Sequence, residues 1–177
     1  MEIIIETDRL TLSKVTEDDA PFILDLLNTP LWIKFIGDRG VRTLEDAQKY
    51  VQERFIKSYE DNGFGMYIIK LKNGDTPIGL SGLVKRPTLD DVDIGYALFD
   101  DFTGKGYAFE ATKGVYNYGK TTLGLKRIVA IVNQDNKLSI KLLEKLGFYF
   151  EKMITSGEDE LRFYANVPPS VIVDFSA

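Results

Sequence analysis

The chain has 177 residues, of which 44% are hydrophobic, and its 27 acidic and 22 basic residues give a formal net charge of -5. This length suits one compact domain with a full hydrophobic core, so we expect a single domain over residues 1–177. The sequence contains no Cys and no His, which excludes disulfides, thiol nucleophiles, thiolate or imidazole metal sites and histidine bases. Catalysis must then use carboxylates, hydroxyls, Lys, Tyr or backbone dipoles, and we expect no metal.

Hydropathy and charge patterns limit the localisation and the classes of partner that we expect. No stretch approaches the roughly 18 apolar residues of a membrane span, and the first ten residues lack the basic start and long apolar core of a signal peptide. No block of five or more basic residues appears, which argues against a nucleic-acid partner. We expect a cytoplasmic protein without a membrane partner, either monomer or homodimer, and the acidic balance favours a cationic substrate.

The first half of the chain predicts two helices and an antiparallel hairpin. Thr16 and Thr43 are each followed three residues later by Asp, the pattern of a helix N-cap, and Asn73-Gly74 is a hairpin turn signal. The predicted elements are a strand at 9–14, a helix at about 17–27, a helix that opens at Thr43 and ends at Asn62-Gly63, and strands at 65–71 and 78–84.

The second half alternates strands and helices. Strands are predicted at 93–99, 127–132, 148–153 and near 161–166, and helices at 107–123 and 137–146. Together with the hairpin, this order predicts an α+β fold with one central mixed sheet and helices on both faces. The apolar tail at 168–177 is an extra edge strand, a dimer contact or a loose end.

Gly104-Lys105-Gly106 lies between a predicted strand and a predicted helix. The free amides and the dipole of a helix start form an anion site, and glycines let the backbone approach a phosphate, although two glycines also serve an ordinary turn. The GxxxxGK[ST] loop is absent, and Phe109 stands where the GxGxxG fingerprint needs its third glycine. A P-loop NTPase and a Rossmann dehydrogenase therefore do not fit.

Three polar residues, Asn133, Asn136 and Ser139, precede the helix predicted at 137–146 or lie in its first turn. The spacing of three between Asn136 and Ser139 puts both side chains on one helix face. Asn136 is also a good N-cap, so a purely structural role stays open at this point.

Four motifs in order resemble the GNAT superfamily of acyl-CoA N-acyltransferases: DIGYAL at 93–98, GKGYAFEA at 104–111, NQDNKLS at 133–139 and LEKLGF at 143–148. The opening ETDRLTLSKVTEDDA at 6–20 is similar to the branch of Rim-type ribosomal-protein N-terminal acetyltransferases. The resemblance spans about 6–167. It implies a mostly antiparallel mixed sheet of about seven strands, with a parallel pair that splays apart.

The resemblance also implies a site for acetyl-CoA. The pantetheine arm would lie between the strands at 93–99 and 127–132, the turn at 103–108 would cradle the pyrophosphate, and Ser139 would sit near the sulfur. Lys105, Lys141 or Lys145 would meet the nucleotide phosphates or remain solvated. The residues expected to bind the co-substrate are Leu98, Phe99, Thr103, Gly104, Lys105, Gly106, Tyr107, Ala108, Asn133, Asn136 and Ser139.

The chain departs from the superfamily pattern at two positions. Asp101 replaces the usual Gln or Arg three residues before the first glycine, and so places an acid beside the expected pyrophosphate. Leu143 replaces the Tyr that protonates the leaving thiolate in many members, which leaves Ser139 or water for that task.

The expected reaction is direct attack of a primary amine on the thioester in a ternary complex, because a chain without Cys forms no acyl-thiol intermediate. Asp93 is the candidate base, or else an exposed acid at a strand end. The expected acceptor pocket consists of Trp32, Phe35, Phe64 and Tyr96 with Asp38 and Asp91, although aromatic residues also serve as core.

The acceptor is a peptide N-terminus, an amino acid, a polyamine or a drug. A catalytically silent acyl-CoA sensing domain and a generic nucleotide-binding α/β protein are the alternatives.

Overall fold

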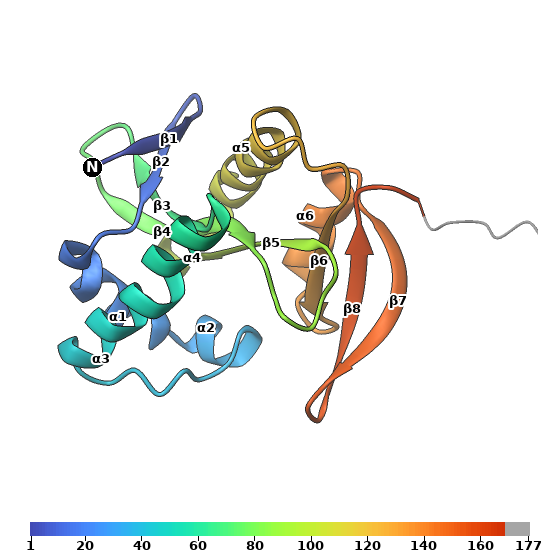
Figure 1. Ribbon diagram of the computed structural model, residues 1–177, viewed down its shortest axis with the longest axis horizontal. Helices are drawn as coiled ribbons and strands as arrows, with labels where there is room; N and C mark the ends of the chain where they lie inside the picture. The colour runs from blue at the N-terminus through green and yellow to red at the C-terminus, as the bar shows by residue number, and fades with distance from the viewer. Residues whose placement is uncertain (169–177) are drawn as a thin grey trace, which may run out of the picture.

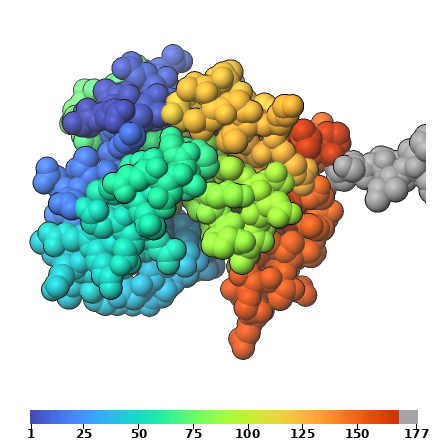
Figure 2. Space-filling view, viewed as in Figure 1, coloured from blue at the N-terminus to red at the C-terminus, as the bar shows by residue number. Residues whose placement is uncertain are grey.

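The computed structural model describes residues 1–168, so most of the tail at 168–177 lies outside the described residues. Eight strands form one sheet in the order β1-β2-β3-β4-β5-β6-β8-β7 (Figure 1). The strands are β1 (Ile3–Glu6), β2 (Leu10–Lys14), β3 (Met66–Leu71), β4 (Pro77–Val84), β5 (Val92–Leu98), β6 (Ile128–Asn133), β7 (Tyr149–Ser156) and β8 (Asp159–Ala165). The β7–β8 hairpin projects beyond the rest of the molecule (Figure 2).

Helices cover both faces of this sheet. On one face lie the short helix η1 (Glu17–Asp19), α1 (Ala20–Leu27), α2 (Pro30–Phe35), α3 (Leu44–Tyr50), the π-helix η2 (Val51–Ile56) and α4 (Lys57–Asn62). The other face carries α5 (Tyr107–Thr121) and α6 (Lys137–Lys145), and the one-turn helix η3 (Asp100–Phe102) follows β5. No helix among residues 1–168 combines the length and hydropathy that crossing a bilayer requires.

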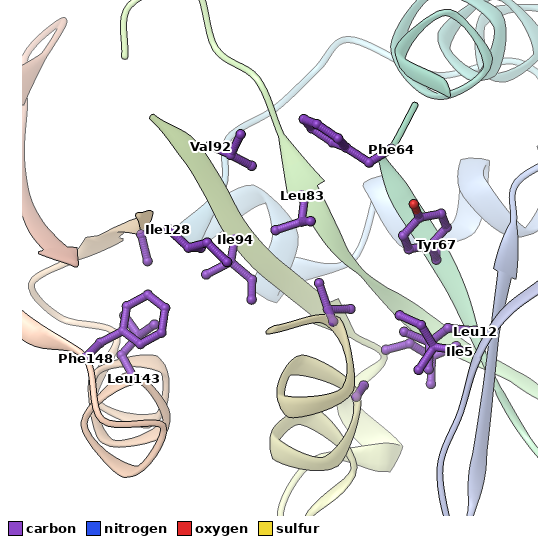
Figure 3. Close-up of a cluster of buried hydrophobic side chains, with 14 of the residues drawn as sticks. Ile5, Leu12, Phe64, Tyr67, Leu83, Val92, Ile94, Ile128, Leu143 and Phe148 are labelled. Atoms are coloured by element: carbon purple, nitrogen blue, oxygen red, sulfur yellow. The ribbon is translucent and has the colours of Figure 1, made fainter. Parts of the chain in front are cut away.

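The core is divided between these two faces. Leu12, Ile69, Val115 and Leu143 belong to a cluster between the sheet and helices α5 and α6 (Figure 3). Ile68 and Leu80 point to the opposite face and pack with α1 to α3. Because side chains alternate along a strand, consecutive residues such as 68 and 69 feed both clusters and fix the register of the sheet.

Strands β5 and β6 form the parallel pair, and they separate after two residues. Val92 pairs with Ile128 and Asp93 with Val129, and no further pair follows. On its other edge β5 stays paired with β4 up to Leu98, and β6 stays paired with β8 up to Asn133. The edges of β5 and β6 that face each other beyond Asp93 are therefore open.

The expected α+β fold with a splayed parallel pair is confirmed, and the sheet has eight strands where about seven were expected. The additional strand is β1, which pairs with β2 around Thr7. The sequence reading also missed α2. Its signal is present, since Thr29 caps the helix with Pro30 in the first helical position.

Candidate active site

A cavity of about 350 Å³ opens where β5 and β6 separate. Its walls come from β5, β6 and α6 on one side and from α2, α3 and η2 on the other. The cavity therefore joins the gap between the parallel strands to the helical face of the molecule.

Asp93 lines this cavity at the point where the strands part, and it is only 3% exposed. Arg86 donates from Nε to Asp93 Oδ2 at 2.7 Å, whereas Asp93 Oδ1 is buried and accepts no hydrogen bond that meets normal geometry within residues 1–168. Burial raises the pKa of Asp93 to about 6, although the Arg86 charge and the nearby Ile131 amide favour the ionised form. The expected strand-end acid is thus a buried carboxyl group facing the cavity.

The open edge of β5 presents the main chain of alternate residues. Phe99 N–H donates to the Ile78 carbonyl on β4 at 3.0 Å, so odd-numbered residues of this strand point toward β4. Ile94, Tyr96 and Leu98 therefore direct their backbone groups into the gap. Leu98 fits the expected pantetheine contact. Both main-chain groups of Phe99 already have partners, because its carbonyl also accepts from Phe102 N–H at 3.0 Å.

The glycine loop places a row of free amides at the start of α5. Gly104 and Gly106 have φ values of +74° and +83°, a region open to glycine, and Gly106 precedes α5 with no side chain capping the helix. Within residues 1–168, the backbone N–H groups of residues 104–109 donate to no acceptor. Such a cluster of amides, together with the helix dipole, fits an anion such as a pyrophosphate.

Arg9 braces this loop from the other end of the chain. Its guanidinium donates to the Lys105 carbonyl at 2.9 Å and from Nε to Glu110 at 2.7 Å, and it stacks over the Tyr107 ring at 4.4 Å. Burial alone raises the pKa of Glu110, but hydrogen bonds from Thr7 and Arg9 outweigh it and hold the pKa low. The sequence reading missed this brace, because the partners are about 100 residues apart.

Residues of α6 face β5 across the gap. Asn136 caps α6 by accepting from Ser139 N–H at 3.3 Å, and Asn133, Asn136 and Ser139 all line the cavity. The Tyr96 hydroxyl lies 2.9 Å from Ser139 Oγ, so a hydroxyl pair spans the open strands. Burial raises the pKa of Tyr96, and the Ser139 hydrogen bond partly opposes that rise.

The family is decided by a match to the acetyltransferase (GNAT) domain over residues 9–149, which is most of the chain. The protein belongs to the GNAT family. The "uncharacterized N-acetyltransferase YoaA" of Bacillus subtilis is 31% identical over 153 residues, covering 85% of each chain. This GNAT protein is therefore an acetyl-CoA-dependent N-acetyltransferase.

Solved structures support the same fold at lower identity. RimL, a ribosomal-protein alpha-N-acetyltransferase in complex with coenzyme A, aligns with a TM-score of 0.79 at 22% identity, over 93% of this chain and 97% of that one. A spermidine N-acetyltransferase chimera from Vibrio cholerae and hSSAT aligns with a TM-score of 0.72 at 18% identity, over 88% and 93%. At these identities the likeness concerns the GNAT fold alone.

The acceptor side of this GNAT protein differs in part from expectation. Trp32, Phe35 and Tyr96 line the cavity, but Phe64 is buried in the cluster under α5. The two expected acids are also elsewhere: Asp38 pairs with Arg42 and Asp91 with Arg127, and neither lines the cavity. The residue types alone could not show which aromatic side chains lie in the core and which line the cavity.

The two departures from the superfamily pattern have structural counterparts. Asp101 is exposed in η3 and forms no ion pair within residues 1–168, so its charge is open to solvent screening. Leu143 is buried between the cavity and the core, and the hydroxyl pair Tyr96–Ser139 lies in the same cavity. Lys105 is exposed and does not line the cavity, and neither do Lys141 and Lys145.

Proposed function

We propose that this enzyme transfers an acetyl group from acetyl-CoA to a primary amine in a ternary complex, with Asp93 as the base. The observation that carries the proposal is the buried Asp93 Oδ1, which accepts no hydrogen bond of normal geometry in residues 1–168 and belongs to a carboxyl group lining the cavity where the parallel strands part. An amine N–H bound in this cavity satisfies that oxygen. Its position at the mouth of the strand gap supports an amine bound beside the expected thioester.

The pKa of Asp93 suits this task. At about 6 it lies close below neutral pH, so the carboxylate is mostly ionised at pH 7 and still has appreciable proton affinity. Arg86 keeps one oxygen occupied and leaves Oδ1 to face the amine. Asp93 then receives the proton that the amine nitrogen loses as its new bond to carbon forms.

The open edge of β5 supplies donors for the carbonyl. The amides of Ile94, Tyr96 and Leu98 point into the gap, where a fixed N–H stabilises the negative charge that develops on a carbonyl oxygen under attack. Acetyl-CoA supplies the thioester carbonyl and a thiolate as the leaving group. We infer that the free amides of residues 104–109 bind its pyrophosphate and that the Nδ2 group of Asn136, whose Oδ1 is used by the cap, donates to the pantetheine arm.

Ser139 and Tyr96 complete the proton balance. As the carbon–sulfur bond breaks, Ser139 gives its hydroxyl proton to the departing sulfur and takes another from the Tyr96 hydroxyl 2.9 Å away. Solvent then restores the Tyr96 proton and removes the one held by Asp93. This pair takes the role that the Tyr at position 143 fills in many relatives.

A thiol-release assay over a panel of amines tests the proposal, with peptide N-termini, amino acids, spermidine and aminoglycosides as acceptors. We expect turnover on at least one amine and thermal stabilisation by acetyl-CoA alone. Stabilisation without turnover on any amine contradicts the enzyme and favours an acyl-CoA sensor. If neither effect appears, the site does not bind acetyl-CoA.

The proposal also concerns which kind of amine is acetylated. RimL is named as acting on a ribosomal protein and the chimera as acting on spermidine, so GNAT relatives of this fold span a protein N-terminus and a polyamine. A peptide N-terminal α-amine suits Asp93, because its ammonium form, with a pKa near roughly 8, is a stronger acid and loses its proton more readily than a lysine ammonium group near roughly 10.4.

A further inference from the structure

The part of the cavity expected to hold the amine substrate is rich in hydrogen-bond donors. Arg39, Arg54 and Arg86 all line it, from the loop after α2, from η2 and from the loop after β4. Trp32 adds an indole Nε1–H that is buried and has no partner within residues 1–168. These four side chains present donors and no acceptor, so this wall is built for a ligand that accepts hydrogen bonds.

The positive charge of this wall is not neutralised inside the cavity. Asp93 is the carboxylate among the lining residues, and it pairs with Arg86. In the described part of the chain, no carboxylate lies within ion-pair distance of Arg39 or Arg54. No carboxylate therefore neutralises these two guanidinium groups, although Arg39 also interacts with the Tyr50 hydroxyl and the chain as a whole carries a charge of -5.

Tyr50 lies within electrostatic reach of all three arginines. Burial raises the pKa of the Tyr50 hydroxyl, and the positive charges of the three arginines oppose that rise. Tyr50 also lines the cavity, at the end of α3 where the π-helix begins. A π-helical turn displaces side chains relative to an α-helix and is often found at functional sites, and here it carries Arg54 on the cavity side.

Given the acetyl transfer proposed above, we propose that the acceptor amine carries a carboxylate, which Arg39 and Arg54 bind while the amine reaches Asp93. Arg binds carboxylates through two parallel N–H donors, and the Trp32 indole adds a third kind of donor. The carboxylate belongs either to a free amino acid or to an acidic residue near a peptide N-terminus. This proposal replaces the cationic acceptor that the net charge favoured, since a polyamine meets two unpaired cations here.

Matched acceptors test the charge directly. The rate of thiol release is compared for alanine against alaninamide, and for a tripeptide amide that begins with Asp against the same peptide with Asn, with spermidine as the cationic acceptor and with rates corrected for the neutral fraction of each amine. We expect kcat/KM at least about tenfold higher for the better charged acceptor than for its amide twin, with the difference mainly in KM and reduced by salt. The two pairs distinguish a free amino acid from a peptide.

Variants assign the effect to the arginines. Arg54→Gln and Arg39→Gln are expected to bring the charged-to-uncharged ratio toward one while the KM for acetyl-CoA stays the same. Lys49→Gln on the exposed face of α3 is the control and leaves the ratio unchanged. Equal or better rates with the amide twin in both pairs, or the best rate with spermidine, overturn the proposal. So does a ratio that survives both variants, or a rise in the KM for acetyl-CoA alone, which assigns the arginines to a phosphate of the co-substrate.

Product binding separates this proposal from the acetyl transfer itself. Calorimetry with N-acetylalanine, N-acetylalaninamide and the two N-acetylated peptides needs no turnover. Tighter binding of a charged product that Arg54→Gln abolishes supports the anion subsite even if no amine is acetylated. Equal affinity for charged and uncharged products refutes it even if acetylation occurs.

Discussion

Replacement of Asp93 by Asn removes a buried carboxyl group while keeping its size. Its pKa rises from 3.8 to about 6 on folding, and a change of roughly two units corresponds to roughly 3 kcal/mol between the protonation states. Because the folded-state value is the higher one, protonated Asp93 favours folding. That contribution is complete below about pH 4 and is lost as the pH rises through about 6.

Chemical denaturation across this range measures the effect. The free energy of unfolding of the wild type should fall by up to about 3 kcal/mol relative to that of Asp93→Asn as the pH rises from about 4 to 7. Asp90→Asn, an exposed acid three residues away, is the control and should follow the wild type. Parallel pH curves for the wild type and Asp93→Asn refute the raised pKa.

The same variant separates the role of Asp93 as a base. Below about pH 6 both Asp93 and the amine must lose a proton, so log kcat/KM of the wild type should rise with a slope near two, and Asp93→Asn should keep a slope near one. The rate deficit of the variant therefore grows as the pH rises to about 6 and is constant above it. A deficit that is also constant below pH 6 shows that Asp93 is not the base.

Three further changes test the rest of the site. Gly106→Ala should raise the KM for acetyl-CoA, because a Cβ there meets Arg9 Nη2 at 3.2 Å beside the free amides. The control Gly124→Ala, similarly strained at φ +68° but in open space, should cost about 1 kcal/mol of stability with no change in this KM. Equal KM values in the two variants count against the phosphate role. Arg9→Gln should raise the same KM several-fold and lower stability by about 1 kcal/mol at most, because its ion pair with Glu110 is partly exposed. Lys14→Gln, which breaks a surface ion pair elsewhere, is the control and should leave the KM unchanged. An unchanged KM in Arg9→Gln shows that Arg9 does not support the loop. Tyr96→Phe should lower kcat about tenfold with little effect on the KM for acetyl-CoA, measured with a single-turnover assay beside Tyr116→Phe, and an unchanged kcat assigns the proton to water.

Local signals predicted most of the elements, because caps and turns act over a few residues. Thr43 caps α3 with Asp46 as expected, and Gly63 ends α4 in the left-handed conformation. Strand β1 was missed because its apolar run at the chain start has no local turn signal that sets its pairing. The π-helix was missed because its hydrogen-bond shift leaves the hydrophobic spacing almost helical.

The sequence by itself determined the order of most elements, the glycine loop before α5 and the four motifs of the family, since each depends on residues close together in the chain. The tertiary structure alone decided what those residues contact. It buried Asp93 beside Arg86, committed both main-chain groups of Phe99, brought Arg9 to the loop and gathered three arginines around Tyr50. Charge and burial at a site are sums over residues far apart in the chain, so an acidic protein can hold a cationic pocket that its composition does not reveal.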